Sequence, residues 1–129
     1  MTVETTNWWK KAEGDYLTMR REFTAPPNFD AVCFHAQQCI EKLLKACLIE
    51  RNIRPPYTHH LPGLAEMLAP RNAELDTLWK DLELLSQYAV SVRYPIEFAD
   101  RQEAKEAMDA CARLRRILLP ELGIQDLFE

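Results

Sequence analysis

The fold of this 129-residue chain is decided by residues 29–51, which read "FDAVCFHAQQCIEKLLKACLIER". Apolar residues recur in this stretch at spacings of three and four, the pattern of one helix face when each residue advances by about 100°. That face comprises Phe29, Val32, Cys33, Ala36, Ile40, Leu43 and Cys47. The stretch therefore predicts a long helix whose inner face needs apolar partners from elsewhere in the chain.

Prolines bound this helix on both sides. "TAPPNFD" at residues 24–30 ends the preceding segment and offers Asn28 as a cap, and "RPPY" at residues 54–57 forms a loop with an exposed Tyr57. A first helix is predicted over residues 6–23, capped by Thr5 or Thr6. Its inner face would be formed by Trp9, Ala12, Tyr16, Met19 and Phe23.

Three further helices are predicted after the loop. A short one begins around "HLPGLAEMLA" (residues 60–69), and a long one spans residues 73–94 and ends before Pro95. The last begins at a capping box of Asp100 and Glu103 and ends at Pro120. The sequence thus predicts an all-α fold, in which four long helices and one short helix pack as an antiparallel bundle in a single domain, residues 1–129.

The composition of the chain disfavours some classes of protein and favours others. Apolar residues make up 47% of the chain, and 16 basic against 20 acidic residues give a net charge of −4, which disfavours a protein that coats DNA nonspecifically. The chain shows neither a signal-peptide pattern nor an apolar run long enough to cross a membrane, so a soluble, cytoplasmic protein is expected. Its cysteines form no CxxC pair, and buried free thiols are expected at Cys33, Cys39, Cys47 and Cys111.

A polar stripe accompanies the apolar face of the helix at residues 29–51. It consists of His35, Gln38, Lys42 and Lys45. One interpretation is a solvated flank, with Glu41 and Lys45 as an i,i+4 ion pair. The other is that the lysines, with an imidazole and an amide beside them, donate hydrogen bonds to an anion such as a phosphate.

Two further places offer candidate ligand-binding residues. Arg93 and Tyr94 lie where a helix meets a proline, and their side chains could either build a site at this corner or satisfy the helix end. His59 and His60 precede the short helix, which one of them could cap. Partners at metal-binding spacing are missing, and so are the common catalytic and nucleotide-loop motifs, so neither a metal nor another cofactor is expected.

Four segments, in this order and spacing, resemble the HEPN domain, the higher eukaryotes and prokaryotes nucleotide-binding family. They are "WWKKAEGDY", "FHAQQCIEKLLKACL", "THHLPGLAEML" and "LSQYAVSVRYP", and the resemblance extends over about residues 6–119. It implies an up-and-down helical bundle, usually a homodimer, that binds nucleotides or RNA in a cleft between long helices. The residues that match by position are His35, Gln38, Lys42, His60, Arg93 and Tyr94.

The resemblance also implies two protein-level roles. HEPN proteins occur beside a small nucleotidyltransferase, which would supply metal-dependent chemistry while this chain binds substrate or docks. Ribonuclease toxins of the family, found in toxin-antitoxin pairs, carry an Arg followed after four to six residues by a His. Here Arg93 is followed by "YPIEFADRQ", without histidine, so a ribonuclease would need His35 or His60 as its base.

Three hypotheses follow from these residues. The first is a dimeric nucleotide-binding module, and the second is a ribonuclease with an incomplete motif. The third is a structural module for dimerisation and docking, to which an exposed Trp8 or Trp79 would contribute.

Overall fold

The computed structural model describes residues 1–89 and 97–126 of the chain. The helices in these two ranges are α1 (Val3–Glu22), α2 (Phe29–Glu50), α3 (Leu61–Glu66), α4 (Ala73–Thr77), α5 (Trp79–Ser86) and α6 (Arg101–Glu121). Neither range contains a strand, so the prediction of an all-α fold is confirmed.

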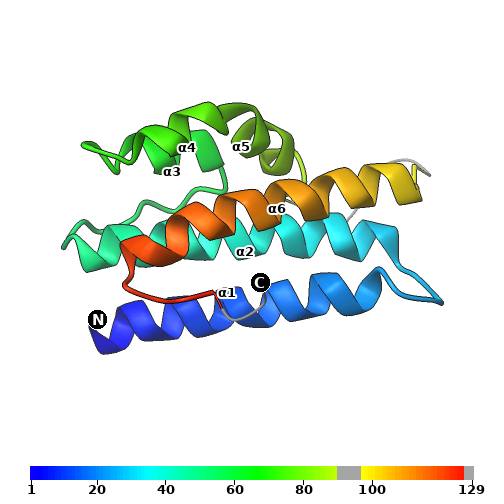
Figure 1. Cartoon of the computed structure of the whole chain (residues 1–129), viewed down its shortest axis with the longest axis horizontal. Coiled ribbons are helices and arrows are strands. Elements are labelled where there is room, and N and C mark those ends of the chain that lie inside the picture. Colours follow the sequence, from blue (N-terminus) through cyan, green and yellow to red (C-terminus); the bar gives the residue numbers. More distant parts are fainter. Residues whose placement is uncertain (90–96, 127–129) are drawn as a thin grey trace.

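The three long helices lie side by side, with α2 between α1 and α6 (Figure 1). α1 runs opposite to α2, whereas α6 runs in the same direction as α2 (Figure 1). The C-terminal ends of α2 and α6 meet, since Nη2 of Arg51 lies 3.1 Å from Oε2 of Glu121. The short helices α3, α4 and α5 form a second layer and return the chain to the start of α6 (Figure 1). The predicted strict up-and-down order of long helices is therefore not observed among the described helices, because the neighbouring α2 and α6 are parallel (Figure 1).

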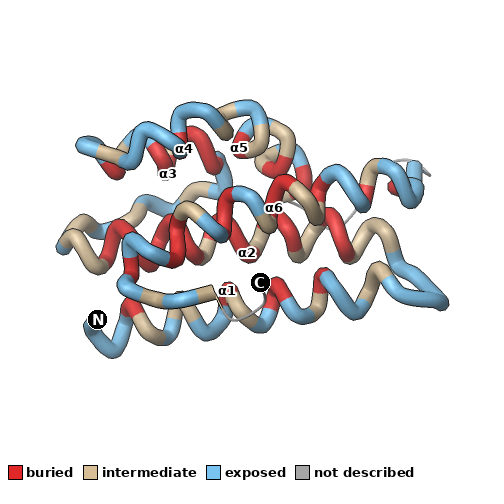
Figure 2. The backbone as a smooth tube through the Cα atoms, in the orientation of Figure 1, coloured by how far each residue is buried: buried red, intermediate tan, exposed pale blue. Residues whose placement is uncertain are grey.

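The core is centred on α2, which carries buried residues along most of its length (Figure 2). The predicted inner face is buried except for Phe29, which is half-buried. Leu44, Ala46 and Leu48 are also fully buried, outside that predicted face. This wider burial arises because α2 packs against α1, α6, α3 and α5. Periodicity alone indicated a single apolar face.

The ends of α1 and α2 are fixed by short polar side chains. The predicted cap of the first helix is wrong, because α1 begins at Val3 and is capped by Thr2, whose Oγ1 accepts a hydrogen bond from the Thr5 amide at 3.0 Å. Asn28 caps α2 as predicted, accepting from the Ala31 amide at 3.1 Å. The chain leaves α2 through Asn52, whose φ of 63° is left-handed, and the Ile53 amide then bonds the Leu48 carbonyl.

The single long helix predicted over residues 73–94 is wrong. Its described part is divided at Leu78, where φ is −107° and ψ is 20°, into α4 and α5. Leucines recur at spacings of three and four in this segment, and of these Leu75, Leu82 and Leu85 are buried whereas Leu78 is half-buried. Both pieces contact α6, but α5 also contacts α2 and α3, so packing on different neighbours favours the break. Residues 90–94 of the prediction lie outside the described residues.

The remaining helix starts agree with the sequence. His60 caps α3 by accepting a hydrogen bond from the Gly63 amide at 3.2 Å, and Pro62 lies in the first turn. Asp100 caps α6 by accepting from the Glu103 amide at 2.8 Å. The Glu103 carboxylate accepts from the Tyr88 hydroxyl at 2.6 Å, which ties the start of α6 to the turn after α5.

Two further features of the structure are the state of the cysteines and the polarity of the helices. All four cysteines are buried thiols that form no disulfide, as the sequence predicted. Burial raises the pKa of the Cys47 thiol to about 12, which keeps it protonated at neutral pH. Within residues 1–89 and 97–126, helices of sufficient length are too polar to cross a bilayer.

Candidate functional site

Asp15 of α1 joins two side chains of the polar stripe on α2. Its Oδ1 lies 2.7 Å from Nδ1 of His35, and its Oδ2 lies 2.6 Å from Nζ of Lys42. Asp15 is only 8% exposed, so its carboxylate requires such partners. His35 and Lys42 face α1 together because they are about two helical turns apart. They therefore belong to the interface between α1 and α2.

Glu41 is the centre of a second cluster on the same helix. Its Oε1 lies 2.8 Å from Nδ1 of His59 and accepts from Nε2 of Gln37 at 3.0 Å, while its Oε2 accepts from Nζ of Lys45 at 3.0 Å. Burial favours a higher pKa for Glu41, but the hydrogen bonds from Gln37, His59 and Lys45 outweigh it and lower that pKa. Glu41 is therefore ionised at neutral pH.

The two clusters have the same composition, because each carboxylate holds one histidine and one lysine. The i,i+4 pair of Glu41 and Lys45 is present as predicted. The stripe is not simply a solvated flank, however, since Lys45 is 8% exposed and the Gln38 amide donates to Oε1 of buried Gln37 at 2.7 Å. Both lysines have an anionic partner within the protein, so an external anion would compete with that carboxylate.

The remaining predicted residues are His60, Arg93 and Tyr94. The ring of His60 caps α3, as described above. Arg93 and Tyr94 lie outside the described residues. His35 and Lys42 of the stripe therefore both contact Asp15, whereas Lys45 of the stripe contacts Glu41 together with His59.

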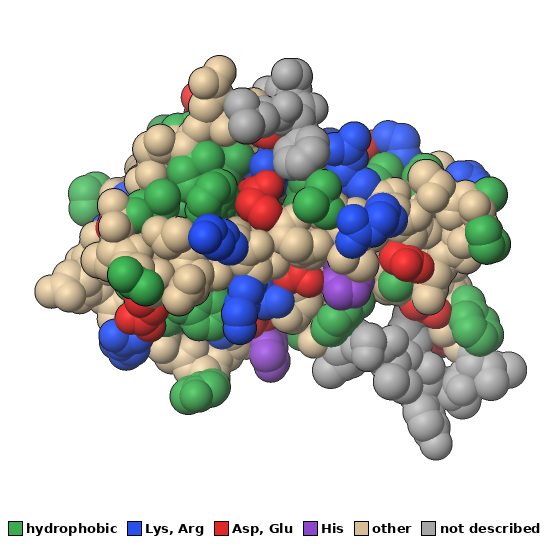
Figure 3. Space-filling model, turned by 90° about the horizontal axis from the view of Figure 1, so that it is seen from below, with side chains coloured by type: hydrophobic (Ala, Val, Ile, Leu, Met, Phe, Trp, Pro, Cys, Tyr) green, Lys and Arg blue, Asp and Glu red, His purple; other side chains and the backbone are tan. Residues whose placement is uncertain are grey.

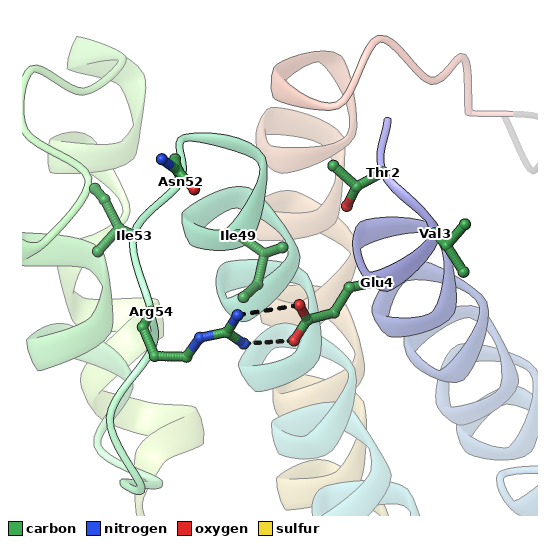
Figure 4. Close-up of a pocket in the computed structure, with 7 residues that line it drawn as sticks. All are labelled: Thr2, Val3, Glu4, Ile49, Asn52, Ile53 and Arg54. Atoms are coloured by element: carbon green, nitrogen blue, oxygen red, sulfur yellow. Dashed lines mark hydrogen bonds and ion pairs between the residues drawn. The ribbon is translucent and has the colours of Figure 1, made fainter.

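A cavity of about 430 Å³ lies where the start of α1 meets the end of α2. It is lined by Thr2, Val3, Glu4, Ile49, Asn52, Ile53 and Arg54 (Figure 4). Across its wall, the guanidinium of Arg54 donates two hydrogen bonds to the Glu4 carboxylate, at 2.5 and 3.2 Å (Figure 4). This bidentate contact, with the positive charge of Arg54, lowers the pKa of Glu4.

A second cavity, of about 240 Å³, lies beside the first and shares Glu4 and Arg54 with it. Its other lining residues are Trp8, Lys45, Pro55, Pro56 and Tyr57. Nζ of Lys45 lies 5.5 Å from the centroid of a Trp8 ring, so the buried lysine of the Glu41 cluster also reaches this cavity. Two cations and two aromatic side chains therefore line one small space.

The surface around α1 is mixed in charge. Figure 3 views the molecule from the side on which α1 lies, and shows lysine and arginine side chains interspersed with carboxylates and histidine. Positive potential on this face is therefore local. Within residues 1–89 and 97–126, no group of three or more His, Cys, Asp or Glu side chains is placed to hold a metal ion.

Comparison with known families shows the family to which the chain belongs. The HEPN domain matches residues 5–122, which is nearly the whole sequence. The chain belongs to the HEPN family. A search of curated proteins found no match.

Two solved structures share the HEPN fold with this chain. TT1696 from Thermus thermophilus has a TM-score of 0.76 and 20% sequence identity, with 93% of this chain and 99% of that one covered. ST0689, described as an archaeal HEPN homologue, has a TM-score of 0.67 and 22% identity, with 95% and 98% covered. At these identities the similarity establishes the fold alone.

Several residues that line the two cavities were not among the predicted ligand-binding residues. No sequence pattern indicated the pair of Arg54 and Glu4, because their contact depends on how α1 lies against the loop after α2. Trp8 and Tyr57 were noticed only as exposed aromatics. The tetrapeptide "RPPY" could have indicated the site, since it places a cation and an aromatic ring on either side of two rigid prolines.

Proposed function

We propose that this HEPN protein is a nucleotide-binding module, and that its ligand binds in the smaller cavity, between α1, α2 and the loop after α2. The observation that carries this proposal is the combination of Trp8, Tyr57, Lys45 and Arg54 around about 240 Å³. Aromatic rings stack on bases, and cations bind phosphates.

The aromatic residues differ in how freely they can meet a ligand. Tyr57 is fully exposed, with a relative accessibility of 107%, whereas Trp8 is half-buried against the core. Tyr57 is therefore free to stack on a base, and Trp8 provides a fixed wall. Stacking of one base on an aromatic side chain contributes about 1–3 kcal/mol.

The two cations differ in the same way. The side chain of Arg54 is 74% exposed and that of Lys45 is 10% exposed. A phosphate can take the place of the Glu4 carboxylate on Arg54, because a guanidinium binds either anion through two parallel hydrogen bonds. Arg54 is accordingly the principal phosphate contact in this proposal, because Lys45 is already paired with the Glu41 carboxylate.

The test is calorimetric titration with ATP and GTP, with and without Mg²⁺. Tyr57→Ala should weaken binding roughly 5- to 150-fold, from the loss of one stacking contact. Arg54→Gln should weaken it as well. Lys105→Ala is the matched control, because that exposed lysine pairs with Asp109 on α6, away from both cavities, and should leave the affinity unchanged.

Arg93→Ala completes the set, because it tests the corner predicted from the sequence. Weaker binding in Arg93→Ala, with unchanged binding in Tyr57→Ala, would move the ligand to residues 93 and 94. A flat titration of the wild-type protein would contradict nucleotide binding and favour the docking role.

We also propose a homodimer and association with a separately encoded small nucleotidyltransferase. Both proposals rest on family membership. Light scattering on the purified protein measures the dimer directly. Co-purification with such a transferase, compared between wild type and Tyr57→Ala, tests whether the partner reaches the same site.

One contact favours a second candidate, the ribonuclease. Asp15 holds Nδ1 of His35 at 2.7 Å, which orients the imidazole as carboxylate partners orient catalytic bases, and Lys42 is on the same carboxylate. Labelled RNA incubated with the protein and a chelator tests this role. Cleavage that disappears in His35→Ala would support it, and intact RNA would contradict it for the RNAs used.

A further inference from the structure

A third cavity, of about 210 Å³, adjoins the cavity proposed for the nucleotide. It is lined by Glu4, Asn7, Trp8 and Lys11 of α1. Glu4 and Trp8 line both of these cavities. The side chain of Glu4 also reaches from α1 to Arg54 (Figure 4). A phosphate that takes the place of Glu4 on Arg54 would therefore lie next to residues of the third cavity.

The residues of the third cavity follow one side of α1. Their spacings of three and four place them above one another on the helix. Lys11 is one turn beyond Trp8 and two turns beyond Glu4, about 10 Å further along the helix axis. Side chains of a helix lean toward its N-terminus, so Lys11 extends back over the turn that carries Trp8. The third cavity thus leads from the Glu4–Arg54 pair to the ammonium group of Lys11.

Lys11 differs from the other cations of these cavities in its lack of an anionic partner. Arg54 is paired with Glu4. Lys45 is paired with Glu41. Within the part of the chain that the structure describes, no carboxylate lies within ion-pair distance of the exposed Lys11. An external anion can therefore bind Lys11 without displacing a carboxylate of the protein.

The two adjoining cavities carry an excess of positive charge. Their basic side chains are Lys11, Lys45 and Arg54, and their acidic side chain is Glu4. The chain as a whole has a net charge of −4, so this excess is local. Such a region attracts a ligand with several negative charges more strongly than a ligand with one or two. The amide of Asn7 can donate further hydrogen bonds to phosphate oxygens.

We propose that this site selects nucleoside polyphosphates, and that the third cavity holds their terminal phosphates. The first phosphate binds Arg54, and the terminal phosphates bind Lys11 and Asn7. The base remains against Trp8 and Tyr57. This inference rests on the proposed function, because it names the ligand class of the same site. Lys11 then distinguishes a triphosphate from a monophosphate, since only the longer ligand reaches it.

The test compares AMP with ATP by calorimetry at fixed ionic strength, with a chelator present so that no Mg²⁺ neutralises the phosphates. ATP should bind at least about tenfold more tightly than AMP. Lys11→Gln should weaken ATP binding by about tenfold, through the loss of one charge-assisted contact, and leave AMP binding unchanged. Lys11→Arg should retain tight ATP binding, because it keeps the charge.

Lys10→Gln is the matched control. It removes the same charge from the preceding residue of α1, which is also exposed but lines neither of these two cavities, and should leave both affinities unchanged. Equal weakening of ATP by Lys10→Gln and Lys11→Gln would indicate a long-range effect of charge and overturn the contact. ATP no tighter than AMP would also overturn it, while AMP binding that depends on Tyr57 would leave the nucleotide site standing. Absence of binding by both nucleotides would overturn both.

Inorganic tripolyphosphate separates a nucleotide from a phosphate chain alone. It should bind more weakly than ATP, because it has no base to stack on Tyr57, and Lys11→Gln should weaken it further. Tripolyphosphate binding as tight as that of ATP, with neither affected by Tyr57→Ala, would overturn the selection of nucleosides and assign the two cavities to a polyphosphate chain.

Discussion

Glu41 shows how a single buried carboxylate links the polar stripe to the loop after α2. It is 4% exposed and accepts hydrogen bonds from Gln37 and Lys45 on its own helix, with His59 of the loop 2.8 Å away. Because its pKa is lowered in the folded protein from the ordinary value of 4.5, folding favours the ionised form. Its contribution is therefore complete above about pH 4.5 and is lost as the pH falls through the lower, folded value.

Glu41→Gln should consequently lower the free energy of unfolding at pH 7 by about 1–2 kcal/mol, since charge-assisted hydrogen bonds are replaced by neutral ones. At pH 3 the wild type has lost part of this contribution, so the difference between the two proteins should shrink. Urea denaturation at both pH values measures it. Glu66→Gln, at an exposed position on α3, is the control and should change little at either pH.

A contact between two side chains could be predicted from the sequence only when the two residues lie close together along the chain. The pair of Glu41 and Lys45 follows from i,i+4 spacing alone, and the capping role considered for His60 follows from its position before Pro62. The contact of Asp15 with His35 does not follow, because it joins two helices whose register is set by packing. The Glu4–Arg54 pair is harder still, since 50 residues separate its members.

At the scale of the elements, the end of α2 shapes the larger cavity. Asn52 has a φ of 63°, and this left-handed residue turns the chain so that Ile53 returns toward Leu48 and Arg54 toward α1. Asparagine and glycine adopt this conformation more readily than other residues. The turn is therefore a local device that positions the cation of the proposed site.

Asn52→Val should destabilise the protein by about 1–2 kcal/mol, because a β-branched residue is strained at this φ. Asn52→Gly should remain within a few tenths of a kcal/mol of wild type, since glycine accepts the conformation. Thermal unfolding of both variants checks the ranking. Equal destabilisation by valine and glycine would show that the lost amide matters and that the backbone angle does not.

The bounds of a helix could be predicted where it packs through one regular apolar face. They could not be predicted where contacts with different neighbours divide the segment. α2 and α6 have regular apolar faces and polar caps, so their bounds follow closely from the sequence. The segment from Ala73 to Ser86 has the same spacing of leucines, yet it divides at Leu78 because its two halves pack on different helices. Periodicity reports which residues point inward and does not report whether the helix stays continuous.

At the scale of the whole molecule, Arg115 joins three parts of the chain. Its guanidinium on α6 lies 2.7 Å from Oε2 of Glu13 on α1 and 2.6 Å from Oδ1 of Asp126, which follows α6. The same group lies 4.2 Å from the ring centroid of Tyr16. The Arg115 side chain is 3% exposed, so this contact is an internal ion pair that holds α1, α6 and the following segment together.

Arg115→Met should destabilise the protein by about 3–5 kcal/mol, because it leaves Glu13 and Asp126 without their shared cation. Arg116→Met, at the next and exposed position of α6, should cost far less. Chemical denaturation measures both. Similar losses in the two variants would mean that the cation at position 115 contributes no more than a surface charge.

The placement of Met1 has a practical consequence for binding experiments. Its amino group lies 3.7 Å from Oε2 of Glu50, and the next two residues, Thr2 and Val3, line the larger cavity. A peptide tag joined ahead of Met1 would begin at the rim of that cavity and remove the charge that Glu50 now faces. Nucleotide affinities should therefore be measured with the tag cleaved or moved to the other end of the chain, or the tag itself becomes a competitor.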